Sequence, residues 1–547
     1  MTTAPMTDVI IVGAGPIGMT LALDLASRGV RSTIIEKTDG GIETPKLGLV
    51  SIRSMEVLRR LGLSDYVRKT VFKRDYGLSM VYCTSIAGYF LGRIPYPSLN
   101  DQPTVEESPE TKWRCSQIFL NPMLHERVRA NRLITLRKLT RFDRFEEKED
   151  HVVVHMTDEA SGEAGSLSAA YLIGCDGAGS NVRRQLGIEM SGRKKLDYSV
   201  AMFFRSAALS SSHGMGDAER YFVMDDKGWW GNISAMDGLE LWRLTVVTNS
   251  ESEVQAVVAD ADNWIRRALG TDAIAFELIS ALPWRRSELI ADNFQSARVL
   301  LAGDSAHTMS PTGGFGMNTG IGDVDNLGWK LAAVLQGWAG PALLGSYTAE
   351  RHPIAVRNSA ASTHNYLQLK SVSQCEGIAE DTLEGEATRE RVGAMITAAT
   401  ETEWETLGIH LGYRYEDSPV IVADGSGAPE DHSRWYTPTA RPGHRAPHRW
   451  ISGGQPNGLS ILDLFGRGFV LLRLGKEPVA CERLADVALK REIPLRVIDL
   501  DDAETAALYE RRLVLVRPDG HVAWRGDVQP ADPEAIWAVV TGRSGTA

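Results

Sequence analysis

The stretch DVIIVGAGPIGMTLALDLASRGVRSTIIEK, residues 8–37, decides the fold of this 547-residue chain. It opens with a run of mostly β-branched residues, 9–12, typical of a strand that is covered on both faces. A glycine-rich turn follows, and apolar residues then recur with helical spacing until Gly29, which is placed to end a helix. A second apolar strand spans residues 32–35. The pattern predicts a strand, a tight turn, a helix and a second strand in direct succession.

The three glycines of the turn have separate physical tasks. Gly13 permits the tight turn, Gly15 lets the backbone approach a pyrophosphate, and Gly18 lets the helix pack close to the strand. Glu36 ends the second strand, where a carboxylate can accept both ribose hydroxyls of an adenosine and would repel a 2′-phosphate. The unit therefore predicts binding of FAD or NAD, with the anionic pyrophosphate at a helix N-terminus.

Two further apolar strands end in an acid next to a glycine. The two motifs are Asp176-Gly177 in AAYLIGCDGAGS and Gly303-Asp304 in RVLLAGDSAH. Behind the second, residues 311–318 (PTGGFGMN) place three glycines within four residues and enter a helix. Such a helix N-terminus offers N–H donors and a positive dipole end to a negatively charged ligand. His307 is interpreted as a structural hydrogen-bonding residue rather than a base.

The order of these motifs is found in one group of enzymes. With GxGxxG near the N-terminus, a mid-chain DG and a later GD, the chain resembles the class A FAD monooxygenases over nearly its whole length. This is the superfamily of para-hydroxybenzoate hydroxylase and phenol hydroxylase. Further segments are similar to hydroxylases that tailor aromatic natural products of the rebeccamycin and aromatic polyketide pathways: GFGMNTGIG, GWKLAA, DLFGRGFVLL and LVRPDGHVAWRGD.

The resemblance implies which residues hold the cofactor. Those expected to bind the ADP half of FAD are Gly13, Gly15, Gly18 and Glu36, with Lys37 as a further cofactor contact. Arg53 and Gln117 match positions that contact the cofactor, with Arg53 close to the flavin. Asp176 and Gly177 match a motif linked to both FAD and NAD(P)H.

The resemblance also places the flavin ring. Asp304, after Gly303, matches the acid that hydrogen-bonds the ribityl chain. The segment beside the isoalloxazine, whose backbone N–H groups meet the flavin O2/N1 edge, corresponds to Pro311, Gly314, Gly316, Met317 and Asn318. Arg53 and Pro311 are the candidate catalytic residues of a flavin and oxygen pocket. No catalytic base is assigned, and no metal is expected.

The activity implied is hydroxylation of a phenolic or polycyclic aromatic substrate. FAD would be the cofactor, NADPH or NADH and O2 the co-substrates, and a flavin C4a-hydroperoxide the oxygen donor. Baeyer–Villiger oxidation or other oxidative tailoring of a polycyclic ketone is an alternative. Halogenation ranks low, because GWWGNIS (228–234) stands where a Trp-x-Trp-x-Ile-Pro motif would be wanted. A non-catalytic FAD-binding protein is a further alternative, which the glycines disfavour.

The spacing of the motifs predicts an α/β fold with a discontinuous Rossmann-like FAD domain. Alternating apolar and polar residues predict an inserted antiparallel-sheet substrate domain. The expected divisions are an FAD domain over 1–70, 105–187 and 291–371, a substrate domain over 71–104 and 188–290, and a linker over 372–439. The C-terminal domain over 440–547 resembles the thioredoxin-like domain of these hydroxylases, without a CxxC motif.

Composition narrows the partners. The net charge is −11 and no long basic block occurs, so nucleic acid is not expected as a partner. The five cysteines form no CxxC, which predicts reduced thiols in a cytoplasmic protein. The hydrophobic stretch 9–26 carries Asp24 and is interrupted by Gly and Pro, so it is not read as a signal or membrane segment. A small aromatic molecule is the expected partner, and a homodimer is left open.

Overall fold

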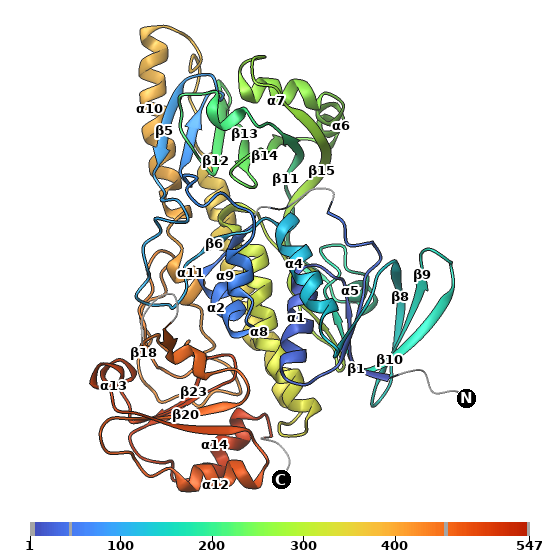
Figure 1. Ribbon diagram of the computed structural model, residues 1–547, viewed down its shortest axis with the longest axis vertical. Coiled ribbons are helices and arrows are strands. Elements are labelled where there is room, and N and C mark those ends of the chain that lie inside the picture. The colour runs from blue at the N-terminus through green and yellow to red at the C-terminus, as the bar shows by residue number, and fades with distance from the viewer. Residues whose placement is uncertain (1–5, 43–45, 47, 453–457, 544–547) are drawn as a thin grey trace.

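The computed structural model describes residues 6–42, 46, 48–452 and 458–543. Three regions are visible in Figure 1. A central region contains the N-terminal strand and long helices, an eight-stranded sheet lies above it, and the C-terminal residues form a smaller region below. The C-terminal region packs against the lower end of the long central helices.

The central region is built on a seven-stranded sheet with the order β7-β2-β1-β10-β9-β8, in which β16 pairs with β10. Its strands are β1 (Met6–Val12), β2 (Ser32–Ile35), β7 (Ile134–Arg137), β8 (Thr140–Glu147), β9 (Val152–Asp158), β10 (Ala164–Gly174) and β16 (Val299–Leu301). The pairs β1–β2, β2–β7, β1–β10 and β10–β16 are parallel, while β9 is antiparallel to β8 and β10. Strands from distant parts of the sequence therefore share one sheet.

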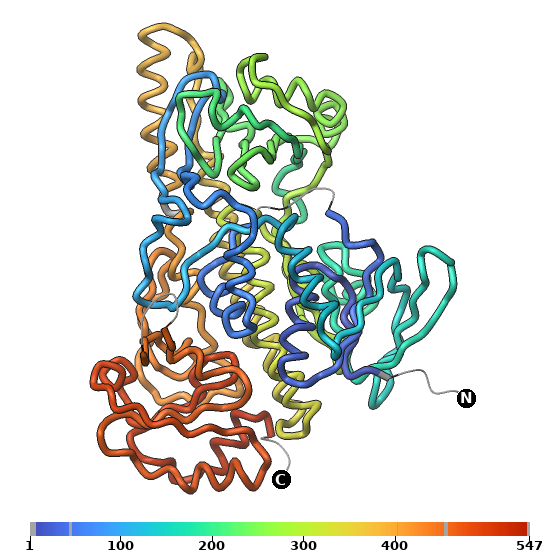
Figure 2. The backbone as a smooth tube through the Cα atoms, viewed as in Figure 1, coloured from blue at the N-terminus to red at the C-terminus, as the bar shows by residue number. Residues whose placement is uncertain are grey.

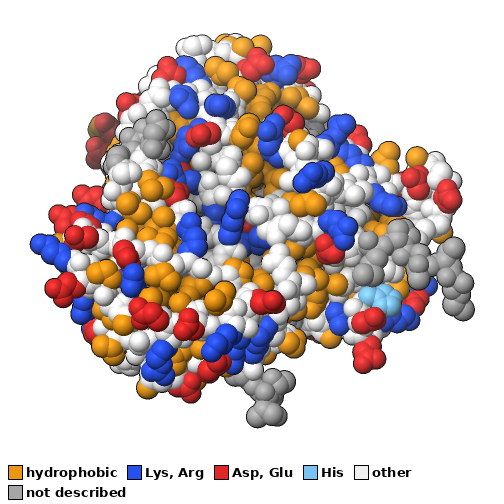
Figure 3. Space-filling view, turned by 60° about the horizontal axis from the view of Figure 1, so that its bottom comes forward, with side chains coloured by type: hydrophobic (Ala, Val, Ile, Leu, Met, Phe, Trp, Pro, Cys, Tyr) orange, Lys and Arg blue, Asp and Glu red, His pale blue; other side chains and the backbone are white. Residues whose placement is uncertain are grey.

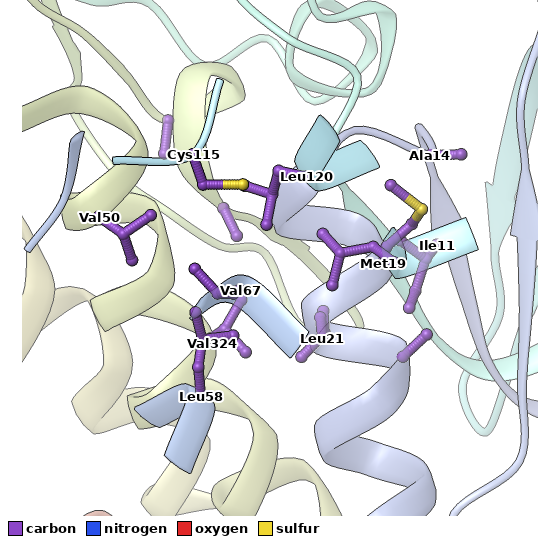
Figure 4. Packing of buried hydrophobic residues seen from close by; sticks show 14 of the residues in the cluster. Ile11, Ala14, Met19, Leu21, Val50, Leu58, Val67, Cys115, Leu120 and Val324 are labelled. Carbon is purple, nitrogen blue, oxygen red and sulfur yellow. The ribbon is translucent and has the colours of Figure 1, made fainter. Parts of the chain in front are cut away.

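Helix α1 (Pro16–Ser27) is packed between this sheet and other helices. Its neighbours are α4 (Gln117–Arg129) and α8 (Phe315–Leu335). Figure 4 shows Met19 and Leu21 of α1 beside side chains from these elements, including Leu120 and Val324. Residues 9–12 are at most 5% exposed, as their β-branched run predicts for a strand covered on both faces.

The eight-stranded sheet, called the upper sheet below, has the order β17-β15-β11-β14-β13-β12-β4-β5. Its strands are β4 (Met80–Cys83), β5 (Phe90–Ile94), β11 (Met190–Arg205), β12 (Arg220–Asp225), β13 (Gly228–Ala235), β14 (Leu241–Thr248), β15 (Glu277–Ala291) and β17 (His307–Thr308). All pairs are antiparallel except β4–β12. Helices α6 (Glu251–Ala259) and α7 (Ala261–Leu269) accompany it. Tyr221 and Trp242 are fully buried core residues.

Residues 372–439 differ from the expected linker. They contain α10 (Leu383–Thr400) and α11 (Leu407–Leu411), which follow the long helix α9 (Ala342–Lys370). Helix α10 runs beside β5, and Figure 2 shows the two segments next to each other at the top of the molecule. A Cβ at Gly393 would lie 1.9 Å from the carbonyl oxygen of Leu91, so the helix backbone touches the strand there. Much of this segment is therefore folded onto the upper sheet.

The C-terminal region contains a four-stranded sheet with the order β21-β20-β22-β23. Its elements are β20 (Phe469–Leu474), α12 (Glu482–Lys490), β21 (Leu495–Leu500), α13 (Ala503–Tyr509), β22 (Leu513–Val516), β23 (Val522–Gly526) and α14 (Pro533–Val540). Strand β20 is parallel to β21 and antiparallel to β22. Phe469 packs edge-on against Trp329 and Trp338, which joins this sheet to α8.

The surface carries charges of both signs. On the face shown in Figure 3, Lys and Arg side chains are interspersed with Asp and Glu side chains. Within the described residues, no helix combines the length and the apolar character needed to span a bilayer. All five cysteines are free thiols, and Cys83, Cys115, Cys375 and Cys481 are buried.

Candidate functional site

The three strand-end motifs meet at one edge of the central sheet. Because β1, β10 and β16 are parallel neighbours, Val12 pairs with Gly174, which pairs with Leu301, and the residues that follow them emerge together. A Cβ at Gly13 would lie 2.3 Å from the carbonyl oxygen of Cys175, so only glycine fits where the first two motifs touch. The Ser305 hydroxyl donates to the carbonyl of Gly174 and joins the third motif to them.

The first turn leaves room in front of a helix. Gly15 is the N-cap of α1, Pro16 is its first residue, and a Cβ at Gly15 would meet nothing within 4 Å. At Gly18 a Cβ would lie 2.1 Å from the carbonyl oxygen of Gly13, which explains the close approach of helix and turn. Open space, free N–H groups and a positive helix end suit a pyrophosphate.

Glu36 stands beside this turn, at the carboxyl end of β2. Its Oε2 accepts a hydrogen bond from the N–H of Ala14 at 2.8 Å, and its Oε1 accepts from the N–H and hydroxyl of Thr38. The carboxylate is thereby oriented next to the GxGxxG turn, and remaining lone pairs suit the hydroxyls of a ribose. Lys37 is exposed next to it.

Asp176 accepts hydrogen bonds from residues of its own motif. Its Oδ2 accepts from the N–H of Asn181 at 2.7 Å, and its Oδ1 accepts from the hydroxyl of Ser180, which caps α5 (Asn181–Gln185). Gly177 has a φ of +79°, a conformation that favours glycine. Nearby, Arg183 is buried and donates to the carbonyl of Ser305 at 2.7 Å. These contacts fix the second motif against the third.

Asp304 meets a residue that the sequence reasoning missed. The Nζ of Lys46 lies 3.0 Å from Oδ2 of Asp304, and both side chains keep part of their surface exposed, 68% and 37%. The carbonyl of Lys46 accepts from the Ser116 hydroxyl at 3.3 Å and from the N–H of Gln117 at 3.5 Å. Lys46 therefore contacts Asp304 through its side chain and Gln117 through its backbone, although no motif surrounds Lys46 in the sequence.

The glycine loop, residues 311–318, turns sharply into α8. Gly313 and Gly314 have φ values of +80° and +70°, and Gly314 is the N-cap of this 21-residue helix. Pro311 is exposed at the start of the loop, while Gly316 and Met317 lie half-buried in the first helical turn. The N–H groups at such a helix end have no partner within the helix, and they suit the negatively charged edge of a reduced flavin.

The Asn318 side chain is part of the scaffold of this loop. Its Nδ2 donates to the carbonyl oxygens of Leu49 and Gly314, and its Oδ1 accepts from the N–H of Ser51 at 2.8 Å and from the Ser54 hydroxyl at 2.7 Å. Ser51 caps α2 (Ile52–Arg60), so Asn318 fastens the start of α8 to the start of α2. Because the Asn318 amide is used in these contacts, the groups of the loop that remain to bind a flavin are its backbone N–H groups.

His307 has a structural environment, as expected. It is fully buried, and its Nε2 lies 2.7 Å from Oδ2 of Asp323. The same carboxylate accepts from the N–H of Gly303 at 3.0 Å and from Nε of Arg351 at 2.8 Å. His307 thus supports the strand end that carries Asp304.

Arg53 lies at the junction with the C-terminal region. Its guanidinium donates to Glu56 at 2.9 Å, to Asp325 at 2.8 Å, to the carbonyl of Asp519 at 2.7 Å and to the hydroxyl of Tyr413 at 3.2 Å. Four of its five N–H groups have protein partners. The contacts favour a structural role over the catalytic one that the resemblance implies.

One face of the upper sheet looks toward the glycine loop. Arg243, Ser234 and Arg220 form a cross-strand row on β14, β13 and β12. From β15, Arg286 donates to the Ser310 hydroxyl at 3.0 Å, just before the loop, and pairs with Asp197 at 3.1 Å. Burial, together with the guanidinium groups of Arg220 and Arg286, lowers the pKa of Arg243 to about 9. The face is polar and rich in positive charge.

The residues present fit an FAD. A cradle of glycines where a Cβ would collide, an open helix N-terminus at Gly15, an oriented acid at Glu36 and a second acid at Asp304 lie along one sheet edge that ends at the glycine loop. A dinucleotide would be held by the first turn and Glu36, and its flavin end by Lys46, Asp304, Gln117 and the backbone of the loop.

Comparisons with known proteins agree with this geometry. Residues 6–362 match the family model described as FAD binding domain, and residues 439–544 match the aromatic-ring hydroxylase C-terminal domain. The chain is 32% identical to the FAD-dependent monooxygenase apdD of Emericella nidulans, over 96% of this chain and 88% of that protein. It is 31% identical to the tetracenomycin A2 monooxygenase-dioxygenase of Streptomyces glaucescens, over 98% and 97%.

A solved structure is similar as well. RebC with bound 7-carboxy-K252c superposes with a TM-score of 0.92 and is 38% identical, covering 99% of this chain and all of that one. The family models together span most of the chain, and the relatives match along almost their full length. The chain therefore belongs to the FAD-dependent aromatic-ring hydroxylases and is a flavoprotein monooxygenase.

Proposed function

We propose that this protein hydroxylates a phenolic or polycyclic aromatic substrate, using FAD, O2 and either NADPH or NADH. The observation that carries the proposal is the position of the glycine loop. The loop follows β16 of the central sheet and β17 of the upper sheet, and Arg286 of the upper sheet donates to Ser310 just before the loop and to Thr312 within it. A substrate on the positively charged face of the upper sheet would be next to the flavin ring.

The chemistry is divided between the cofactor and the chain. FAD, when bound, supplies the redox chemistry, because it takes electrons from a nicotinamide and activates O2. The first turn and Glu36 would hold its ADP half, while Asp304 and Lys46 would orient the ribityl region. The N-terminus of α8 would stabilise negative charge at the flavin ring.

The upper sheet would bind the substrate. Phenols react with electrophilic oxygen more readily when electron density on the ring is raised, and a phenolic oxygen near a guanidinium is more easily ionised. The row Arg243–Ser234–Arg220 provides such an environment opposite the loop. Phe203 is the cross-strand neighbour of Arg243 and adds an aromatic side chain to this face.

We also propose the domain roles that follow from this arrangement. The central region is the discontinuous FAD domain, the upper sheet is the substrate domain, and the C-terminal β-α-β-α-β-β-α unit is a thioredoxin-like domain. Cys481 is buried and is the one cysteine of that unit, so the role of the domain is packing rather than thiol exchange.

A substrate screen tests the function. Purified protein should be yellow and should release FAD on denaturation. Phenolic and polycyclic aromatics are then tested with NADPH and with NADH. A true substrate stimulates oxidation of the nicotinamide and yields a product 16 mass units heavier. Yellow protein that forms only peroxide with every aromatic tested would contradict hydroxylation and leave FAD binding intact. The same product mass from a ketone, with ring expansion, would assign a Baeyer–Villiger reaction.

A further inference from the structure

A buried carboxylate touches the glycine loop from outside the three cofactor motifs. Glu403 belongs to the short turn Glu401–Glu403 that follows α10, within the segment expected to be a linker. It is 3% exposed, and its Oε1 accepts a hydrogen bond from the N–H of Gly313 at 2.9 Å. Gly313 has a φ of +80°, a conformation that glycine adopts readily, so this contact is made at the turn of the loop.

The rest of this carboxylate is poorly satisfied. Its Oε2 is buried and makes no hydrogen bond among the described residues. Its nearest ion-pair partner, Arg220, lies 3.9 Å away, which is too long for a hydrogen bond. Burial raises the pKa of Glu403 above its ordinary value, although Arg220 opposes the shift. A buried acid with one hydrogen bond is costly, and such groups are retained where they have a task.

Arg220 connects this acid to the upper sheet. It begins β12, pairs across the sheet with Ser234, and lies with its guanidinium 5.3 Å from the centre of the Trp404 ring. Arg220 therefore lies on the face proposed for the substrate and next to the carboxylate that holds the loop. The carbonyl groups of Ser310 and Thr312 are held independently by the Ser362 hydroxyl of α9. Glu403 thus ties Gly313 of the loop to the turn that follows α10.

We propose that Glu403 is a positioning residue that fixes the glycine loop against the flavin. In this proposal the charge of Arg220 modulates the hydrogen bond between Glu403 and the Gly313 N–H. The inference rests on FAD binding and not on the identity of the substrate. The carboxylate acts through the Gly313 N–H, so it governs the orientation of the loop rather than the oxygen chemistry itself. Arg220, on the face assigned to the substrate, links that face to the loop.

The test uses holoenzyme variants and readouts of the bound flavin. Glu403→Ala removes the acceptor, whereas Glu403→Gln keeps an acceptor oxygen and loses the charge. Glu405→Gln is the matched control, because Glu405 lies two residues away, is about half exposed and pairs with Arg434. For each variant, the dissociation rate of FAD is followed by the rise of flavin fluorescence on dilution, and the visible absorption and circular dichroism of the bound flavin are recorded.

We expect FAD to leave Glu403→Ala at least fivefold faster than wild type, with visible bands shifted toward those of free FAD. Glu403→Gln should fall between the two, and Glu405→Gln should match wild type. Thermal unfolding identifies any variant that is misfolded. If Glu403→Ala folds and its flavin signals equal those of the control, Glu403 is not a positioning residue.

A double-mutant cycle tests the part played by Arg220. Arg220→Gln alone should change the flavin signals in the same direction as Glu403→Gln, and Arg220→Lys should restore them in part. When Arg220→Gln and Glu403→Gln are combined, the effect should be smaller than the sum of the two. Additive effects would remove Arg220 from the proposal. A failure of every aromatic substrate would leave these flavin measurements unaffected, so the two proposals fail separately.

Discussion

Two sets of paired charges in this molecule differ in their access to solvent. At the cofactor edge, Lys46 and Asp304 form a pair whose side chains are 68% and 37% exposed. Between the central helices and the C-terminal region, Lys330, Glu350 and Arg517 are fully buried, with Glu350 bound to both cations at 2.6–2.9 Å. The exposed pair can exchange its partners for a cofactor. The buried set cannot, and it holds two regions of the chain together.

The physical reason lies in what each pair loses when it opens. An exposed ion pair is worth about 0–1 kcal/mol, because water and salt replace either partner. Removing one member of a buried set leaves the other charges without solvation. Burial disfavours ionisation of Glu350, yet Arg517 and Lys330 outweigh it and hold the pKa of Glu350 well below its ordinary value. A binding site is therefore built from the first kind of pair and a domain junction from the second.

The largest effect is expected at the junction. Glu350→Gln leaves Lys330 without its ion-pair partner and Arg517 with Asp519 alone, and it should lower the free energy of unfolding by about 3–5 kcal/mol. Denaturant unfolding of the holoenzyme measures it. The control is Asp499→Asn, which breaks an exposed pair with Arg473 and should cost less than about 1 kcal/mol. Equal losses in the two variants would contradict the distinction drawn between buried and exposed pairs.

A smaller effect, on the cofactor alone, is expected at Glu36. Glu36→Ala removes a charge-assisted hydrogen bond to the ribose, worth roughly 1.5–3 kcal/mol, so FAD should bind roughly ten- to hundredfold more weakly. FAD retention on dialysis and titration of the stripped protein measure it. Asp8→Asn, at the opposite end of the same sheet, should retain FAD like wild type. Unchanged FAD affinity in Glu36→Ala would remove this acid from the site.

Asp304 tests the exposed pair directly. Asp304→Asn should change the free energy of unfolding by less than about 1 kcal/mol, because Lys46 regains water. The same substitution should weaken FAD binding by roughly 0.5–1.5 kcal/mol, the net value of one hydrogen bond. A large loss of stability with normal FAD content would show that this pair belongs with the structural set.

The last effect depends on pH and concerns Lys112, which is half-buried. Burial and the nearby Arg114 lower the pKa of Lys112 to about 7, and its Nζ lies 4.0 Å from the centre of the Tyr96 ring. The unfolded chain keeps this proton up to about pH 10.5, so between pH 7 and pH 10 the unfolded state binds more protons and stability should rise with pH. The free energy of unfolding of Lys112→Met should rise less than that of wild type between pH 7 and pH 9.5. Parallel profiles in denaturant unfolding would exclude Lys112 as the cause.

Local sequence pattern was enough to predict the strand-end motifs of the central sheet. The GxGxxG turn, Glu36 and the two acid–glycine strand ends are each defined by residues adjacent in the chain, and the parallel strands of the sheet bring them together. The FAD-dependent hydroxylase family is confirmed by the family models and relatives. The ligand contacts of the individual residues stay predictions.

Other features had no local signal. Helix α10 has buried residues such as Val392 and Ile396 but no continuous apolar stripe, and its acidic composition resembled a linker. At Gly393 the absence of a side chain lets this helix pack directly on the β5 backbone, a contact between segments far apart in the sequence. Arg53 was assigned to the flavin by its surroundings in the sequence, while its partners Asp325, Tyr413 and Asp519 come from distant segments.

The sequence by itself determined the cofactor class, the α/β character and the motifs that meet at one edge of the central sheet. These follow from spacing, because a tight turn, a close helix and a strand-end acid each require particular residues at fixed distances along the chain. Only the tertiary structure brought Lys46 to Asp304, Glu403 to Gly313 and Arg53 to the C-terminal region. Such contacts join residues far apart in sequence, where burial and charge decide the partner and spacing carries no information.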